Sequence, residues 1–287
     1  MKAPPFAYAR AESLDDALGL LAEAGDEAKL LAGGQSLVPL LVHRIVRPTH
    51  LVDVDGLTEL AGSRRDERGL VLGALTRHAE LERAELVGRE RVLALAASQV
   101  GHVPIRSRGT LGGSIAHADP AAELPAALLA LDAEVVARSR SGERTIAVSE
   151  LFLGPFTTVL RPDEAIAEVV VPVAAREGRA AFAEFAVRAG DFALASVAVT
   201  ALVDGGRSSQ ARIVLGAVEG VPVRAGTAEA LLEGARLDDA TIAGAAAVAA
   251  SGCDPVDDPA TSAAYRRTLV ARLVRDALGR LRGEVER

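Results

Sequence analysis

The stretch RSRGTLGGSIAHADPAAELPAA, Arg106–Ala127, decides the fold, because it joins a glycine pair, a histidine, two carboxylates and an apolar helical run. Its counterpart is LAGGQSLVPLL, Leu31–Leu41, where a second glycine pair follows a hydrophobic run. Glycine permits positive φ and close approach of a ligand to backbone N–H groups, and a following helix adds the positive end of its dipole. We expect the two loops to form halves of one anion site for a dinucleotide diphosphate. Each loop alone is also compatible with an ordinary tight turn.

The composition is that of a globular protein with a sizeable core. The chain has 287 residues, 49% of them apolar, and a net charge of −7 with acidic and basic residues interspersed. This balance argues against nucleic acid as a principal partner. The N-terminal residues lack the apolar run of a signal peptide, and the most apolar windows, 192–203 and 242–250, are shorter than the ~20 residues of a membrane span. We therefore expect a cytoplasmic protein without a membrane span.

Counts of cysteine, histidine and lysine limit the cofactors that this chain can hold. Cys253 is the single cysteine, so a disulfide or a cysteine-ligated iron–sulfur cluster within the chain is excluded. The five histidines are scattered without metal-ligand spacing, so we expect no metal site. Only Lys2 and Lys29 are lysines, and Lys29 lies beside the first glycine loop, either as a ligand contact or as a solvated strand end.

The first subdomain is expected at about residues 1–57, as a small β-α-β unit. Ser13 is placed to cap a helix with a 3.6-residue apolar period, which Gly25 ends. The remaining expected elements are a strand at 28–32, a short helix capped by Ser36, and a strand at 50–54. The first glycine loop then lies at the strand-to-helix turn.

The second subdomain is expected at about residues 58–174. Its expected elements are a strand at 69–74, a helix capped by Thr76, helices at 89–100 and 121–131, a hairpin of 133–138 and 144–148, and a strand at 163–171. A change of composition at 173–179 indicates a domain boundary, so we expect domains 1–174 and 175–287. In the second domain we expect three antiparallel strands, at 181–188, 192–203 and 211–218, followed by helices at 226–232, 238–250 and 261–282.

Several common site motifs are absent. No two glycines are separated by one residue and no G-K-[ST] occurs, so the Rossmann fingerprint and the Walker loop are both missing. The hydrolase nucleophile elbow also fails, because Ala116 and Val38 stand where its second glycine belongs. The paired acids at 15/16, 53/55 and 238/239 are read as caps and solvated faces. His117 and Asp119 are either a proton-transfer pair or structural; Asp119, before Pro120, is the natural turn residue, and the role of His117 stays open.

Three stretches together resemble a known family, the FAD-binding medium subunit of molybdenum hydroxylases, which includes carbon monoxide and xanthine dehydrogenases. They are KLLAGGQSLVPLL with RPTHLVDV, IRSRGTLGGSIAHADPAAELPAALLALDA, and GPFTTVLRPDEAI, and the later FAVRAGDFALASVAV agrees. The resemblance implies an α+β fold. A two-subdomain FAD-binding (PCMH-type) domain would be followed by a small C-terminal domain of a three-stranded antiparallel sheet with helices.

The resemblance also implies which residues contact non-covalent FAD. The first loop would wrap the diphosphate, and the second would close the site from the other side. Glu123 would face the ribose or adenosine portion and Ile166 the ring system, while a lysine that relatives often have near Glu184 is missing here. The full expected set is Lys29, Leu30, Leu31, Ala32, Gly33, Gly34, Gln35, Ser36, Leu37, Thr110, Gly112, Gly113, Ser114, His117, Asp119, Glu123, Ile166, Arg188 and Asp191.

By the same resemblance, the protein would be the electron-transfer subunit of a heteromeric molybdenum hydroxylase. It would pass electrons from a 2Fe-2S small subunit to NAD, a quinone or oxygen, while molybdopterin resides on a large subunit. The expected assembly is a dimer of heterotrimers. The alternative is a non-redox scaffold subunit with the same fold and a degenerate flavin site. The substrate of the whole enzyme cannot be read from this chain, because the substrate pocket lies on the large subunit.

Overall fold

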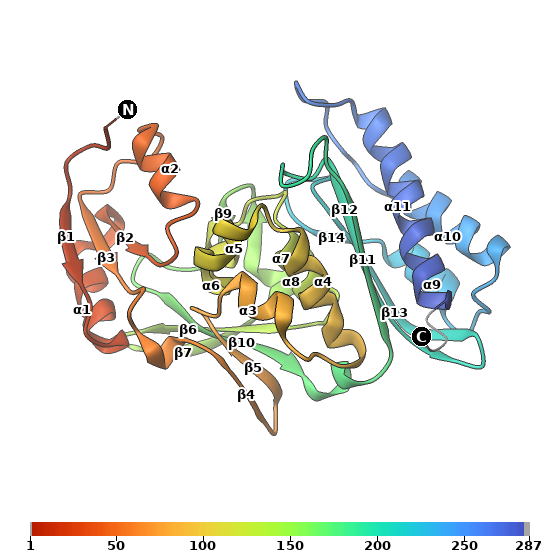
Figure 1. Ribbon diagram of the computed structural model, residues 1–287, viewed down its shortest axis with the longest axis horizontal. Helices are drawn as coiled ribbons and strands as arrows, with labels where there is room; N and C mark the ends of the chain where they lie inside the picture. The colour runs from red at the N-terminus through yellow and green to blue at the C-terminus, as the bar shows by residue number, and fades with distance from the viewer. Residues whose placement is uncertain (1, 284–287) are drawn as a thin grey trace.

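The computed structural model describes residues 2–283 and has an α+β architecture (Figure 1). The N-terminal unit stands at one end, a five-stranded sheet lies in the middle, and a four-stranded sheet with its helices forms the other end. Within the described residues, every helix is too short or too polar to cross a bilayer. No group of three or more His, Cys, Asp or Glu side chains there is arranged to hold a metal ion.

The N-terminal unit is a parallel three-stranded sheet with strand order β1-β3-β2. Ala7 of β1 and Ala28 of β2 both lie opposite His50 of the central strand β3. The predicted β-α-β unit is therefore present, and the sequence analysis missed only its edge strand β1. The elements are β1 (Ala7–Arg10), α1 (Leu14–Ala24), β2 (Ala28–Leu31), α2 (Leu37–Val42) and β3 (His50–Asp53).

Helix α1 forms where its capping residues predict it. The Ser13 hydroxyl accepts the Asp16 N–H at 3.1 Å, and Gly25 ends the helix with φ of +57°. The apolar stripe of α1, which includes Leu14, Leu18 and other buried residues, packs on β3. Burial of this stripe fixes the helix on one face of the N-terminal sheet.

The middle unit is an antiparallel sheet with strand order β4-β5-β10-β6-β7. Helices α3, α4, α6 and α7 share one hydrophobic core with β5, β6 and β10. The elements are β4 (Ser63–Asp66), β5 (Gly69–Gly73), α3 (His78–Arg83), α4 (Arg91–Gln99), α5 (Val103–Arg108), α6 (Leu111–His117), α7 (Glu123–Leu129), β6 (Glu134–Ser139), β7 (Gly142–Ala147), α8 (Val148–Leu151), β8 (Phe152–Gly154), β9 (Thr157–Thr158) and β10 (Ala165–Pro172).

Some local predictions in this unit were wrong. Arg77, not Thr76, is the N-cap residue of α3, and the buried Thr76 hydroxyl instead donates to the Gly62 carbonyl at 2.8 Å. Helices α5 and α6 were missed altogether. Both have fewer than eight residues, and such short helices form through tertiary contacts that a local apolar pattern does not reveal.

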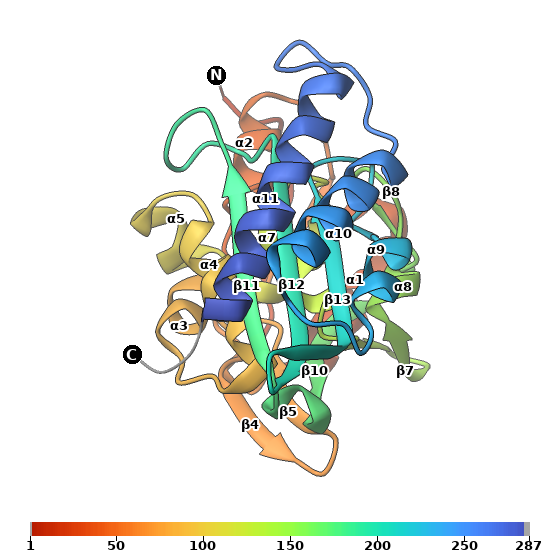
Figure 2. The ribbon, with the colours of Figure 1, turned by 90° about the vertical axis from the view of Figure 1, so that its right-hand side faces the viewer.

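The C-terminal sheet is four-stranded rather than three-stranded, with order β11-β12-β13-β14. The two-residue strand β14 was missed, and β11 ends at Phe185, so Arg188 lies in the following loop. Helices α9, α10 and α11 cover the outer face of this sheet (Figure 2). The elements are β11 (Arg179–Phe185), β12 (Ala195–Asp204), β13 (Arg207–Gly216), β14 (Val223–Arg224), α9 (Gly226–Leu232), α10 (Asp239–Gly252) and α11 (Ala263–Gly283).

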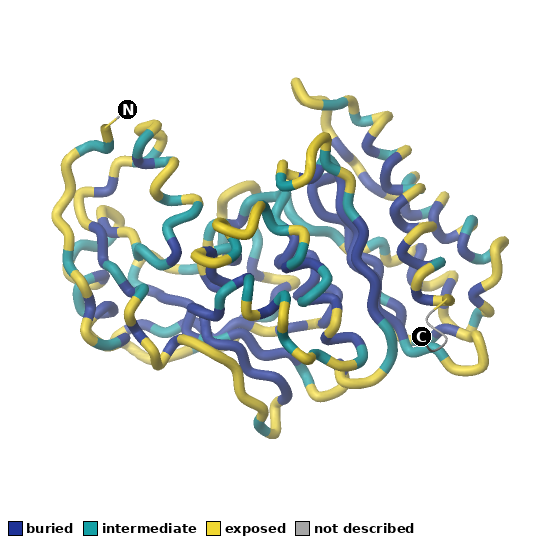
Figure 3. The backbone as a smooth tube through the Cα atoms, viewed as in Figure 1, coloured by how far each residue is buried: buried dark blue, intermediate teal, exposed yellow. Residues whose placement is uncertain are grey.

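The two faces of the C-terminal sheet belong to two different cores. Alternate residues of β11 separate accordingly: Ala180 and Phe182 join the core of α4 and α7, whereas Ala181 and Ala183 join that of α9–α11. The chain is thus layered as sheet, helices, sheet and helices, and the strands β11–β13 are buried on both faces (Figure 3). The predicted domain boundary at 174/175 falls in the 3₁₀ turn Val173–Arg176 and stays a prediction.

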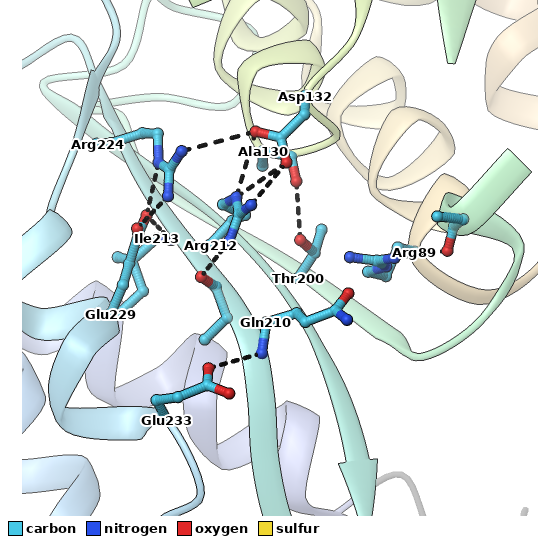
Figure 4. A network of polar contacts seen from close by, with 12 residues as sticks. Arg89, Ala130, Asp132, Thr200, Gln210, Arg212, Ile213, Arg224, Glu229 and Glu233 are labelled. Atoms are coloured by element: carbon cyan, nitrogen blue, oxygen red, sulfur yellow. Dashed lines mark hydrogen bonds and ion pairs between the residues drawn. The ribbon is translucent and has the colours of Figure 1, made fainter. Parts of the chain in front are cut away.

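Polar contacts tie the C-terminal sheet to the end of α7 (Figure 4). The buried Thr200 hydroxyl donates to the Ala130 carbonyl at 2.8 Å. The Asp132 carboxylate pairs with Arg212 at 2.9 Å and with Arg224 at 3.6 Å. These contacts, together with the shared apolar core, fix the position of α7 relative to the C-terminal sheet.

Candidate flavin site

The first glycine loop connects β2 to α2 and leaves a run of backbone N–H groups without protein partners. Within residues 2–283, the N–H groups from Gly33 to Leu37 donate to no protein acceptor; the next one, of Val38, bonds the Gly34 carbonyl at 3.0 Å. Gly34 turns the chain with φ of +72°. Ser36 occupies the N-cap position, but its side chain makes no capping bond. The loop therefore offers five consecutive donors and a hydroxyl.

The two glycine loops are in direct contact. A Cβ on Gly33 would overlap the carbonyl oxygen of Arg108 and stand 3.1 Å from the Cα of Gly109. The first loop makes one bond within itself, from the Gln35 side-chain amide to the Gly33 carbonyl at 3.0 Å. Contact with residues 108–109 therefore sets where the donor run stands.

The second loop differs from the expectation that both loops present backbone donors. The N–H of Leu111 bonds the Thr76 carbonyl at 2.9 Å, and that of Gly112 bonds the Ala74 carbonyl at 2.8 Å. The N–H of Gly113 bonds the Thr110 hydroxyl at 3.2 Å, and that of Ser114 bonds the Thr110 carbonyl at 3.0 Å. All four donors at the start of α6 are occupied, so the expected second half of an N–H cradle is wrong.

The glycines of the second loop instead allow close packing. A Cβ on Gly112 would stand 2.6 Å from the Cβ of Ala74, and one on Gly109 would stand 2.8 Å from Nδ1 of His78. His78 is buried, and burial lowers its pKa to about 4, so its ring is neutral at pH 7. Its Nε2–H then donates to the Thr110 carbonyl at 3.0 Å. The second loop is thus fixed on β5 and α3.

The structure reveals a polar group that the sequence analysis had not assigned to the site. Asp55, which follows β3, pairs with Arg77 at 2.8 Å and with Arg108 at 3.2 Å. Sequence reasoning read Asp55 as a turn residue. The available signal was Arg77 itself, because an arginine stands directly between a strand and a helix, where a short capping side chain is usual.

One face of α6 is open beside the first loop. Gly113 and Ala116 are exposed and Ser114 is half-buried. His117 lies against the Phe156 ring, with 5.1 Å between ring centroids, and its Nε2 is 3.9 Å from a carboxylate oxygen of Asp119. Asp119 also accepts the Ala121 N–H at 2.9 Å, which shapes the turn before α7. The residues at 113, 114 and 116 on this face are all small.

Glu123 on α7 and Glu184 on β11 lie close enough across the joint with the C-terminal sheet for the charge of Glu184 to act on Glu123. Glu184 has the same parity on β11 as Ala180 and Phe182, which point toward α7. Burial, together with the charges of Glu184 and Asp119, raises the pKa of Glu123 to about 8. Burial also raises the pKa of Glu184 to about 7. Within the described residues, Oε2 of Glu184 is buried and has no hydrogen-bond partner.

The other predicted contacts are less closely tied to the loops. Lys29 is exposed on the edge strand β2, and Ile166 is buried in the main core on β10. Arg188 and Asp191 are exposed on the β11–β12 loop, which meets α5 through Gly190 against the His102 ring. Their contact with FAD stays a prediction. Leu30, Leu31 and Ala32 are half-buried and lead directly into the donor run.

Models of known protein families match nearly the whole chain. The FAD binding domain in molybdopterin dehydrogenase matches residues 4–174, and the CO dehydrogenase flavoprotein C-terminal domain matches residues 180–281. The chain belongs to this family. It is an FAD-binding medium subunit of the molybdenum hydroxylase type, and an oxidoreductase subunit, as the resemblance predicted.

Individual relatives of this medium subunit span nearly its whole length. It is 45% identical to the 6-hydroxypseudooxynicotine dehydrogenase complex subunit alpha of Paenarthrobacter nicotinovorans, covering 98% of this chain and 97% of the relative. It matches a structure of carbon monoxide dehydrogenase from Hydrogenophaga pseudoflava with a TM-score of 0.93 and 36% identity, covering 97% and 98% of the two chains. Quinoline 2-oxidoreductase from Pseudomonas putida 86 matches with a TM-score of 0.91 and 34% identity, covering 98% of each chain. The predicted fold class is confirmed.

Substituting Gly33 by Ala tests the contact between the loops in this medium subunit. The added methyl group cannot fit against the Arg108 carbonyl, so we expect the free energy of unfolding to fall by about 1–3 kcal/mol. Gly19→Ala is the matched control: no atom lies within 4 Å of its new Cβ inside α1. It should stabilise by roughly 0.5–1 kcal/mol. Urea unfolding measures both, and equal stability of the two variants would contradict the contact.

Replacing Glu184 by Gln tests the buried carboxyls through pH. Because both carboxyls have raised pKa values, the folded state keeps protons that the unfolded state releases. The wild-type carboxyls therefore cost nothing below about pH 4.5 and destabilise increasingly as pH rises toward 8. We expect Glu184→Gln to match wild type at pH 5 and to exceed its Tm by about 2–6 °C at pH 8.5. Exposed Glu67→Gln is the control. Thermal unfolding scans at both pH values measure the Tm difference between variant and wild type. A Tm difference that does not change with pH would contradict the raised pKa values of the two carboxyls.

Proposed function

We propose that this chain binds FAD non-covalently and serves as the electron-transfer subunit of a heteromeric molybdenum hydroxylase. It would receive electrons from a 2Fe-2S small subunit and pass them to a terminal acceptor, while molybdopterin resides on a large subunit. The family match and the names of relatives, which include a complex subunit alpha and medium chains, support this reading. A dimer of heterotrimers and a cytoplasmic location are parts of the same proposal.

The observation that carries FAD binding is the run of five unpaired N–H groups from Gly33 to Leu37. Backbone donors left without protein partners need water or a ligand, and successive N–H groups in a turn form a concave anion site. A diphosphate supplies several acceptor oxygens for such a run. The donor chemistry of this loop therefore fits the diphosphate of FAD.

Other residues of the site have roles that follow from their positions. The Ser36 hydroxyl is free to donate to a phosphate oxygen because it caps nothing. The open face of α6, where the small residues Gly113 and Ala116 are exposed, would support the planar part of FAD. FAD, when bound, supplies the redox chemistry through its ring system. The protein binds and orients it, and no acid–base residue is required of this chain.

Non-covalent attachment agrees with where the candidate nucleophiles lie. Cys253 is buried in the core of the C-terminal domain, and burial raises the pKa of its thiol. His117 packs against Phe156. Neither side chain is a free nucleophile at the donor run.

The chain co-expressed with its partner subunits tests the function directly. We expect the purified complex to release near-stoichiometric FAD on acid precipitation, because nothing in the proposal links FAD covalently, and the released flavin is measured by its fluorescence. Gel filtration and pull-down identify the partners. A complex that releases no flavin and takes up no added FAD would favour the scaffold alternative instead.

Two serine substitutions separate ligand binding from helix capping. Ser36→Ala should weaken FAD binding about 10- to 150-fold, as expected for one hydrogen bond to a charged group, and leave the apo protein's stability unchanged, because no capping bond is lost. Ser13→Ala removes the bond to the Asp16 N–H and should cost about 1 kcal/mol of stability without changing FAD affinity. Flavin fluorescence titration and thermal unfolding measure both effects. If both variants lost stability and neither lost FAD affinity, Ser36 would not contact the phosphate.

A further inference from the structure

A three-residue polar cluster joins the N-terminal unit to the second glycine loop. The Asp55 carboxylate accepts from Nη2 of Arg77 at 2.8 Å through one oxygen and from Nη2 of Arg108 at 3.2 Å through the other. Asp55 follows β3, whereas Arg77 caps α3 and Arg108 ends α5. We call these three residues the clasp. The carboxylate thus bridges two arginines that belong to the other side of the site.

The clasp reaches the donor run through one carbonyl group. Nη1 of Arg77 donates to the Arg108 carbonyl oxygen at 2.6 Å, and that same oxygen is the atom against which Gly33 packs. The backbone of Arg77 is itself fixed, because it forms a bridge with Thr110 and its N–H bonds the Glu80 carboxylate at 2.9 Å. A continuous set of contacts therefore runs from Asp55 to the start of the donor run.

The clasp is not what holds the N-terminal and middle units together. Leu18 of α1 shares an apolar core with Leu75 and with Ala165 of β10, and this core connects the two units independently of the clasp. The side chains of Asp55 and Arg77 are 23% and 21% exposed, and that of Arg108 is 57% exposed. Partly exposed ion pairs contribute little to folding stability. The clasp is therefore better placed to fix geometry than to stabilise the fold.

The donor run needs such an external support. Its N–H groups make no hydrogen bonds to protein, and its carbonyls at Gly34 and Ser36 bond only forward into α2, so the loop's own backbone bonds do not tie it to the second loop. A ligand that binds a loop already held in the correct geometry loses less free energy to ordering. The Arg108 carbonyl supplies a fixed surface against Gly33, and Arg77 holds that carbonyl.

We propose that Asp55, Arg77 and Arg108 are positioning residues that preform the diphosphate-binding loop by holding the Arg108 carbonyl against Gly33. This inference rests on the FAD-binding function proposed above. Arg77 is the central member, because it contacts both the Asp55 carboxylate and the Arg108 carbonyl. Arg108 and Asp55 complete the cluster and keep the Arg77 guanidinium in place.

Titration of the full-length apo chain with FAD, followed by flavin fluorescence, tests the clasp. If Arg77→Gln leaves the loop in its binding geometry one tenth of the time, the Kd for FAD rises roughly tenfold. Asp55→Asn should raise Kd less, and Arg77→Lys should fall between wild type and Arg77→Gln, because an ammonium group cannot serve both partners at once. Arg64→Gln is the control, since Arg64 on β4 pairs with Glu168 on β10, away from the loops, in an ion pair about as exposed as that of Arg108 with Asp55. It should leave Kd unchanged.

A second measurement distinguishes positioning from a general loss of structure. Spin labels on Val38→Cys and Ser107→Cys report the separation of α2 and α5 without FAD; both positions are exposed, and the native Cys253 is buried. Arg77→Gln should broaden that distance distribution while the apo Tm stays within about 2 °C of wild type. A merely structural role would lower Tm and affinity together.

The outcomes show whether the proposed FAD-binding function or the proposed role of the clasp is wrong. A wild-type chain that binds no FAD refutes the proposed function, and the spin-label distances still report whether the clasp holds the loop. A wild-type chain that binds FAD, together with an Arg77→Gln chain that binds it within twofold and keeps a narrow distance distribution, overturns the clasp alone.

Discussion

The geometry of the flavin site depends on one van der Waals contact, between Gly33 and the carbonyl group of Arg108. The first loop belongs to a parallel sheet at one end of the molecule, and the carbonyl belongs to the short link between α5 and α6. Only a residue without a Cβ permits this approach. The contact determines where the unpaired N–H groups stand relative to the open face of α6, so the proposed binding surface lies between two units and belongs to neither alone.

The remainder of the fold supplies rigidity to one side of that contact. Helix α6 is fixed on β5 by backbone bonds from Leu111 and Gly112, and its inner residues lie in the main core. Helices α4 and α7 lie between two sheets, so the structure behind the site is packed on both sides. A loop with unpaired donors facing a rigid scaffold is the common arrangement of a binding site, because the scaffold sets the position and the loop supplies the contacts.

The sequence predicted local structure well where the signal was local. The cap at Ser13, the stop at Gly25, the hairpin of β6 and β7, and the fold class inferred from resemblance are present. The sequence-based predictions failed where tertiary contacts determine the local structure. Helices α5 and α6 are too short to carry an apolar period, and Asp55 gained its arginine partners only through folding. No local pattern reveals that Glu184 and Glu123 meet across a domain joint.

The two glycine pairs look alike in sequence but differ in the hydrogen bonding of the backbone around them. Each N–H from Leu111 to Ser114 has a protein acceptor, whereas those from Gly33 to Leu37 have none within residues 2–283. Backbone donors without a protein partner are satisfied by water or by a ligand, because each missing bond costs free energy. A scaffold subunit with a degenerate site would have no need of a contiguous unpaired run held against its neighbour through Arg77. That requirement belongs to a protein that binds an anion, and for this reason the hydrogen bonds, more than the glycines themselves, favour the flavin-binding function.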